Sequence, residues 1–174
     1  MALFTVDVED WNHALHIHRG DHTSSNIITD YLLPTLDKYS VKGLFYVLGR
    51  FKTENPFVVQ MIGEHGHIIG NHGEYHDHNE DPEDFWKPYR SPYWDTTPMP
   101  YPPSGGFFFR AMPYSYVKWA VNKSGVFWLH PHDLDEQHPK IKNQLLNWKR
   151  HVGLKGARKK LERLLKEVKF DEPR

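Results

Sequence analysis

The first ten residues place acidic side chains at the end of a strand-like stretch. Residues 3–8 are mostly apolar and β-branched, and they favour a buried β-strand. Asp7, Glu9 and Asp10 lie within this stretch or directly after it. Because removing a carboxylate from water is costly, such groups need a metal ion, a cation or water beside them. The stretch therefore indicates either a strand that runs into an acidic turn or a chemical site.

The segments that follow alternate between helical and extended patterns. An amphipathic stripe over residues 27–39 predicts a helix that Pro34 kinks or shortens, and residues 55–62 predict a second helix. The continuous apolar run at 44–48 predicts a buried strand, and residues 66–70 predict a third short strand. This β-α-β-α-β order indicates an α/β fold with a parallel sheet or barrel. In such folds catalytic groups gather where strands end.

The third predicted strand leads into a pair of histidines. His72 and His76 are spaced so that they share one face of a helical turn. Two imidazoles and a carboxylate from another strand form a ligand set with open positions, which suits zinc or another divalent metal with a bound water. The alternative is a pair of surface histidines. Because both the histidines and the carboxylates follow apolar strands, the pattern favours a metal site.

The second half of the chain shows the same organisation. Residues 110–119 predict a short helix, and residues 126–129 predict a buried strand that ends at His130 and His132. From Ala157 onward, leucines recur at helical spacing between basic residues. That helix could contact anionic lipid, but we expect it to pack on the domain.

Composition narrows the function classes. The 174 residues suffice for one domain, 1–174. Lysine plus arginine and aspartate plus glutamate both number 22, so net charge gives no case for nucleic-acid or membrane binding. With no cysteine, disulfides and thiolate metal sites are excluded. We find no signal peptide and no transmembrane segment, and therefore expect a cytoplasmic protein.

Several motifs, in their order, resemble the polysaccharide deacetylases of the NodB-homology family. The first three stretches are Phe4–Trp11, Gly66–His76 and Tyr89–Tyr93. Further stretches resemble a subgroup with an Asp-Val-Glu-Asp first motif and a characteristic C-terminal extension, here the helical residues 143–174. These are Gly105–Tyr114, Phe127–Asp135 and Trp148–Leu154.

The resemblance implies a distorted (β/α) barrel and metal-dependent removal of an N-acyl group from a sugar. His72 and His76 would hold the metal together with one carboxylate of the first motif, while another carboxylate acts as general base. Either Glu9 is the base and Asp10 the ligand, or Asp7 is the base and Glu9 the ligand. Strand alternation favours the second assignment. The shorter side chain and commoner ligand type of Asp10 favour the first, to which we lean.

The resemblance also implies roles for later residues. Arg90 would orient and charge the base, and the backbone N–H of Tyr93 would bind the oxyanion. His130 would protonate the leaving amine, because its intrinsic pKa suits that task at neutral pH. Trp11 and Tyr93 would contact substrate. His132 replaces the tryptophan expected in this subgroup and is either a substrate contact or a partly exposed loop histidine.

The chain also departs from the family pattern. The segments 76–90 and 92–105 are short, and the usual fourth motif has no clear match. We therefore expect a compacted or incomplete barrel, whose strand edges a partner subunit of a homo-oligomer could cover.

The function predicted is an amide-hydrolysing N-deacetylase of an acetylated amino sugar in surface polysaccharide biosynthesis, either O-antigen or exopolysaccharide. Zinc is the expected metal, with cobalt, nickel or manganese as alternatives. A glycan-binding relative without turnover and a hydrolase of a non-sugar amide are the alternative functions.

Overall fold

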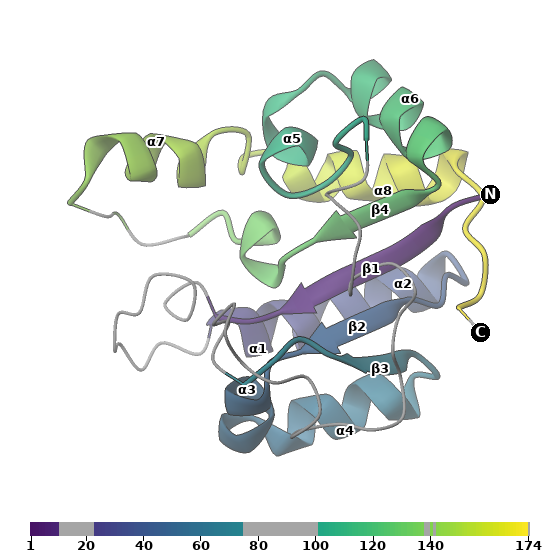
Figure 1. The fold of residues 1–174 in the computed structure, drawn as a ribbon, viewed down its shortest axis with the longest axis vertical. Coiled ribbons are helices and arrows are strands. Elements are labelled where there is room, and N and C mark those ends of the chain that lie inside the picture. The colour runs from purple at the N-terminus through teal and green to yellow at the C-terminus, as the bar shows by residue number, and fades with distance from the viewer. Residues whose placement is uncertain (11–22, 75–100, 138–139, 141, 174) are drawn as a thin grey trace.

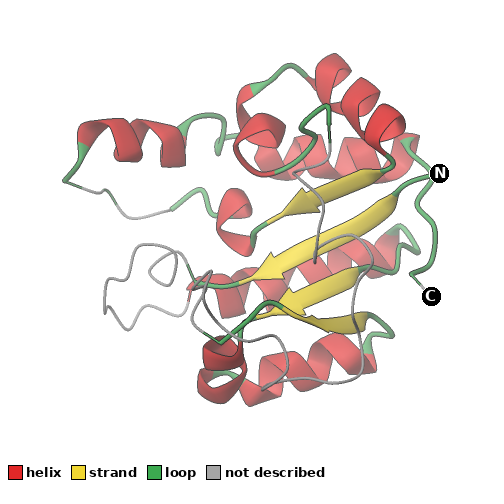
Figure 2. Ribbon diagram, in the orientation of Figure 1, coloured by secondary structure: helices red, strands yellow, loops and turns green. Residues whose placement is uncertain are grey.

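The structure is a computed structural model that describes residues 1–10, 23–74, 101–137, 140 and 142–173. Its centre is one parallel sheet in the strand order β3-β2-β1-β4 (Figure 2). The strands are β1 (Leu3–Val8), β2 (Leu44–Val47), β3 (Ile68–Asn71) and β4 (Val126–Leu129). The expected parallel α/β fold is confirmed. Within the described part of the chain the sheet is open, in keeping with the incomplete barrel that we predicted.

Strand β1 lies inside the sheet, paired with β2 on one side and β4 on the other. Val6 is in register with Phe45 and with Leu129. Because all four strands are parallel, their carboxyl ends share one edge of the sheet. The acidic residues after β1, His72 after β3 and His130 after β4 therefore start from the same edge.

The helix that we expected around Pro34 is continuous but changes its winding. It consists of α1 (Thr23–Ile27), the π-helical η1 (Ile28–Leu32) and α2 (Leu33–Lys38). The N–H of Leu33 bonds to the carbonyl of Ile28, one residue further back than in an α-helix. Pro34 lacks an N–H and crowds the preceding turn, so the wider turn accommodates the kink predicted there. The next helices are α3 (Gly49–Glu54) and α4 (Pro56–Glu64).

The single helix predicted over residues 110–119 is wrong in its bounds, because two helices occupy this region. Helix α5 (Gly106–Ala111) ends before Pro113, and α6 (Tyr114–Ser124) begins after it. Pro113 has no N–H to continue the first helix. The remaining elements are the 3₁₀-helix η2 (Pro131–Leu134), α7 (Gln144–His151) and α8 (Ala157–Glu167).

Helices lie beside both outer strands of the sheet: α4 lies beside β3, while α5, α6 and α8 lie beside β4 (Figure 1). Phe4 and Phe127 are fully buried at the centre of the core. Leu161 and Leu164 of α8 are also fully buried, so the expected packing of this helix on the domain is confirmed. Among the described residues, no helix has the length and apolar character needed to cross a bilayer.

Candidate active site

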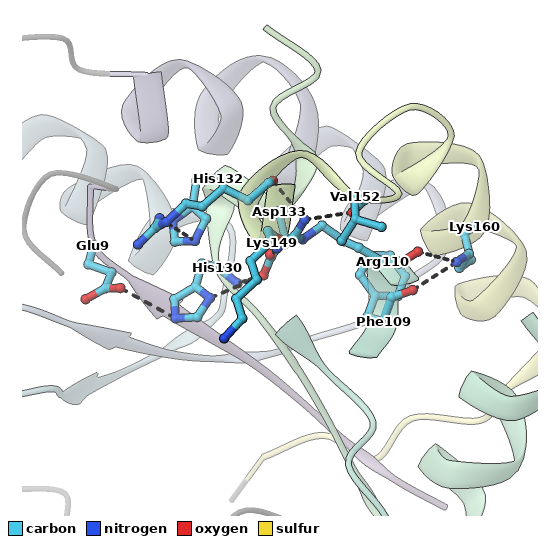
Figure 3. Close-up of polar contacts among 10 residues, drawn as sticks. Glu9, Phe109, Arg110, His130, His132, Asp133, Lys149, Val152 and Lys160 are labelled. Carbon is cyan, nitrogen blue, oxygen red and sulfur yellow. Dashed lines mark hydrogen bonds and ion pairs between the residues drawn. The ribbon is translucent and has the colours of Figure 1, made fainter. Parts of the chain in front are cut away.

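Carboxylates and an imidazole meet at the carboxyl edge of the sheet. Asp7, in β1, is 3% exposed, and Glu9 and Asp10 directly after it are 1% and 2% exposed. The Oε1 atom of Glu9 lies 3.5 Å from Nε2 of His130 (Figure 3). Two groups that can exchange a proton therefore face each other across the ends of β1 and β4.

Asp7 has the environment of a proton acceptor. Its Oδ1 atom is buried and has no hydrogen-bond partner among the described residues. Burial raises the pKa of Asp7 to about 7; the charge of His130 opposes this change, while those of Glu9 and Asp133 add to it. A carboxyl group that titrates near neutrality can serve as a general base.

Asp10 is turned toward the start of α1. Its Oδ1 atom accepts a hydrogen bond of 3.2 Å from the N–H of Ser24, whose hydroxyl donates to the carbonyl of Glu9 at 2.8 Å. These contacts favour the assignment in which Asp7 is the general base and Glu9 is the metal ligand. The metal-ligand role of Asp10 stays a prediction.

The ring of His130 is held by Asp133. Its Nδ1 atom lies 3.2 Å from Oδ2 of Asp133, and the backbone N–H of His130 donates to the same oxygen at 2.8 Å. Burial lowers the pKa of His130, but the hydrogen bond and charge of Asp133, with the charges of Glu9 and Asp7, raise it to about 9 overall. The Nε2 side remains directed at Glu9.

His132 packs directly on His130. The two rings are stacked, with centroids 4.5 Å apart and planes at 12°. His132 is 7% exposed, and its Nε2 lies 3.4 Å from Nη1 of Arg150 in α7. It is therefore a buried residue beside the candidate acid rather than a partly exposed loop histidine. Its contact with substrate stays a prediction.

The metal-binding set is only partly within the described residues. His72 follows β3, where its N–H donates to the carbonyl of Val47 at 3.2 Å and its ring centroid lies 6.5 Å from that of Tyr46. The predicted ligand His76 and the predicted site residues Trp11, Arg90 and Tyr93 lie outside the described residues.

A second group of possible ligands is formed by His130, His132 and Asp133, whose ligand atoms all lie within 4.8 Å of one another. One oxygen of Asp133 is already paired with Arg110 at 2.6 Å. A metal ion there would lie close to a guanidinium, which disfavours it electrostatically. Asp7, Glu9, Asp10 and His72 supply the ligand types of a divalent-metal site, but within the described part of the chain they do not form a group as compact as this one.

Arg110 and Asp133 form a buried ion pair that the sequence analysis did not predict. Arg110 is 6% exposed and Asp133 is 1% exposed. Burial alone would raise the pKa of Asp133, but its hydrogen bond to His130 and the charges of His130, His132 and Arg110 hold that pKa well below its ordinary value. One signal was present: Arg110 follows the apolar run 107–109, and a charge in such a run needs a buried partner.

Comparisons with known proteins match parts of the chain. The family model described as a domain of unknown function, DUF3473, matches residues 91–174. The chain is 38% identical over 56 residues to the peptidoglycan-N-acetylmuramic acid deacetylase PdaA of Bacillus subtilis, covering 32% of this chain and 21% of that protein. The same identity and length relate it to the peptidoglycan-N-acetylglucosamine deacetylase PgdA of Listeria monocytogenes, with 12% of that protein covered.

One solved structure covers most of the chain. It is a mutant of a CE4 family pseudoenzyme with restored enzymatic activity, and it aligns with 96% of this chain and 63% of its own at 13% identity and a TM-score of 0.44. The curated relatives are matched over about a fifth of their length or less. Together, the sequence matches support a relation to the NodB-type deacetylases.

Proposed function

We propose that the chain is a metal-dependent N-deacetylase of an acetylated amino sugar and belongs to the NodB-homology family, in its Asp-Val-Glu-Asp subgroup. The observation that carries this proposal is the pairing of Glu9 with His130, 3.5 Å apart, beside the buried Asp7. A base and an acid at one strand edge suit amide hydrolysis, in which water loses a proton and the departing amine gains one.

Each residue then has a defined role. His72 and His76, with Glu9 or Asp10, would hold the metal, for which zinc is the best fit. When bound, such a metal supplies Lewis acidity to the amide carbonyl and lowers the pKa of water. Asp7 accepts the proton of the attacking water, because its Oδ1 atom is buried without a hydrogen-bond partner among the described residues.

The remaining residues serve the leaving group and the substrate. His130 donates its Nε2 proton to the departing amine, and the amide C–N bond breaks to give acetate and a free amino sugar. The Tyr93 N–H stabilises the oxyanion, and Arg90 orients the base. Trp11 and His132 contact the sugar.

Two substrate classes fit this chemistry. The matched relatives are named as deacetylases of N-acetylmuramic acid and N-acetylglucosamine in peptidoglycan, which supports an N-acetylated amino sugar. A precursor of a surface polysaccharide that contains the same acetamido group is the second class. The shared requirement is an acetamido sugar with an accessible carbonyl.

The test combines metal analysis with amine release. Protein reconstituted with zinc, cobalt, nickel or manganese is incubated with N-acetylglucosamine oligomers, peptidoglycan fragments and a non-sugar acetamide. We expect stoichiometric metal and turnover of a sugar substrate, with both lost in His76→Ala. His130→Gln should retain metal but lose turnover, and the control His65→Gln should retain both.

Three outcomes would contradict parts of this proposal. Metal retained at full stoichiometry by His76→Ala would overturn the ligand assignment. Turnover of the non-sugar acetamide alone would overturn the substrate class. Metal and glycan binding without release of acetate from any substrate would overturn the enzymatic function and indicate a glycan-binding relative.

A further inference from the structure

The guanidinium of Arg110 joins three parts of the molecule. Its Nε donates to Oδ1 of Asp133 at 2.6 Å. Its other nitrogens donate to backbone carbonyls at the end of α7: Nη1 to Arg150 and Val152, both at 2.8 Å, and Nη2 to Lys149 at 3.1 Å. Arg110 therefore links α5 and the end of α7 to the carboxylate in η2 (Figure 3).

The same carboxylate reaches His130 with its other oxygen. Oδ2 of Asp133 accepts the backbone N–H of His130 at 2.8 Å and lies 3.2 Å from Nδ1 of its ring. An ionised carboxylate can only accept hydrogen bonds. Since Asp133 is buried against a guanidinium on one side, the geometry requires a proton on Nδ1 of His130 on the other.

We propose that Asp133 and Arg110 are positioning residues for His130. Asp133 holds the proton on Nδ1 and turns Nε2 toward Glu9, where a leaving amine would be protonated. Arg110 fixes the carboxylate and connects it to the end of α7, so the packing of this helix and the orientation of His130 depend on one ion pair. The catalytic consequence rests on the proposed deacetylase function, whereas the orientation of the ring does not.

A purely structural role is the competing explanation, because Arg110 also satisfies carbonyls at a helix end. Lys160 provides a matched comparison. It is a partly buried cation in the same region, and its Nζ donates to the carbonyls of Phe109, Arg110 and Met112 at 3.0, 3.0 and 2.9 Å. Replacing Lys160 removes comparable backbone contacts while leaving Asp133 and His130 in place.

The decisive variant is Asp133→Asn. A carboxamide has one accepting oxygen and one donating nitrogen. If its oxygen keeps the bond to Arg110, its NH₂ group faces His130 and favours the ring form with an unprotonated Nδ1. Nitrogen-15 spectra of the histidine rings, with His130 assigned through His130→Gln, report this difference directly. We expect a protonated Nδ1 in the wild type and in Lys160→Met, and an unprotonated Nδ1 in Asp133→Asn.

Kinetics supply the second readout. Asp133→Asn should reduce kcat by about 100-fold or more with little change in KM, since a neutral ring with an unprotonated Nδ1 is a far weaker acid at Nε2 than the imidazolium that Asp133 stabilises. Arg110→Lys keeps a positive charge but cannot form the same fork of hydrogen bonds, and we expect about a tenfold loss of kcat. Lys160→Met should retain wild-type kcat.

The two readouts separate this proposal from the proposed function. A protonated Nδ1 in Asp133→Asn, or equal losses of kcat in Lys160→Met and Arg110→Lys, would overturn the positioning role. A wild type without turnover would contradict the deacetylase function alone, because the spectra still test the ring. If Asp133→Asn does not fold, Arg110→Lys carries the test, and an unchanged kcat there overturns the role of Arg110.

Discussion

Gly153 lies so close to Arg110 that a β-carbon built on the glycine would stand 2.1 Å from the Arg110 carbonyl oxygen. The φ angle of Gly153 is +70°, in the left-handed region that favours glycine. The residue follows the end of α7 at His151 by one intervening position. Only a residue without a side chain lets the chain turn this closely against α5.

We therefore expect Gly153→Ala to lower the free energy of unfolding by about 2–5 kcal/mol, combining backbone strain with overpacking. Gly125→Ala is the matched control, because Gly125 has φ +73° and, apart from its two chain neighbours, no atom of the described residues lies within 4 Å of the position that a β-carbon would take there. That variant should lose about 1–2 kcal/mol from strain alone. Urea denaturation measures both, and equal losses would contradict the close contact at Gly153.

Helix α8 supplies a second prediction. Leu164 is fully buried, whereas Lys159 on the same helix is exposed. Leu164→Ala should lower the free energy of unfolding by about 2–5 kcal/mol because it leaves a cavity in the core. Lys159→Ala should change it by less than about 0.5 kcal/mol. Similar values for the two variants in urea denaturation would contradict the packing of α8 on the sheet.

The sequence was informative wherever local pattern decides structure. Continuous apolar runs predicted β2 and β4 close to their observed bounds, because a buried parallel strand has no polar face. Pro34 predicted the distorted helix for a local steric reason. The division between α5 and α6 was equally local, since Pro113 stands at the break, but the apolar stripe on either side obscured it.

Local sequence patterns could not predict contacts between residues that are distant in the sequence. Arg110 and Asp133 are 23 positions apart, and no periodicity of the sequence relates α5 to the 3₁₀-helix η2, which follows β4. Likewise, pattern alone left the first-motif assignment open. Only the contacts of Asp10 with Ser24 and of Glu9 with His130 distinguish the directions of these carboxylates. The roles of His76 and Arg90 stay predictions.

His67 makes stability depend on pH. Its Nδ1 accepts the N–H of Gly43 at 3.1 Å, and the side chain is buried. Burial lowers the pKa of His67 to about 4; the charges of Lys42 and His65 act in the same direction, and that of Asp37 opposes them. The unfolded chain therefore binds a proton more readily than the folded chain between pH 6.5 and about 4.

The stabilising contribution of neutral His67 is complete above pH 6.5 and is lost as the pH falls toward 4, with a total of about 3 kcal/mol. Urea denaturation across this range should show a shallower pH dependence for His67→Gln than for the wild type. His151→Gln, which removes a histidine from α7, should keep the wild-type slope. An unchanged slope in His67→Gln would contradict a neutral buried ring.

Replacing Asp7 should lower activity without lowering the stability of the fold. Its carboxylate is buried in β1 with an unpartnered Oδ1 among the described residues, so its charge is costly to the fold. Asp7→Asn removes that charge but also removes the proton acceptor. We expect the free energy of unfolding to stay equal or rise by about 1–3 kcal/mol, while amine release falls by about 100-fold or more.

Two measurements on the same protein preparations check this expectation. Urea denaturation at neutral pH gives the change in stability, and amine release from N-acetylglucosamine oligomers gives the change in kcat. Asp37→Asn serves as the carboxylate control, because Asp37 pairs with Lys42 and His65 away from the site and should not affect kcat. An Asp7→Asn protein that is strongly destabilised would show that the buried carboxylate serves the fold, and one that retains wild-type kcat would exclude Asp7 as the base.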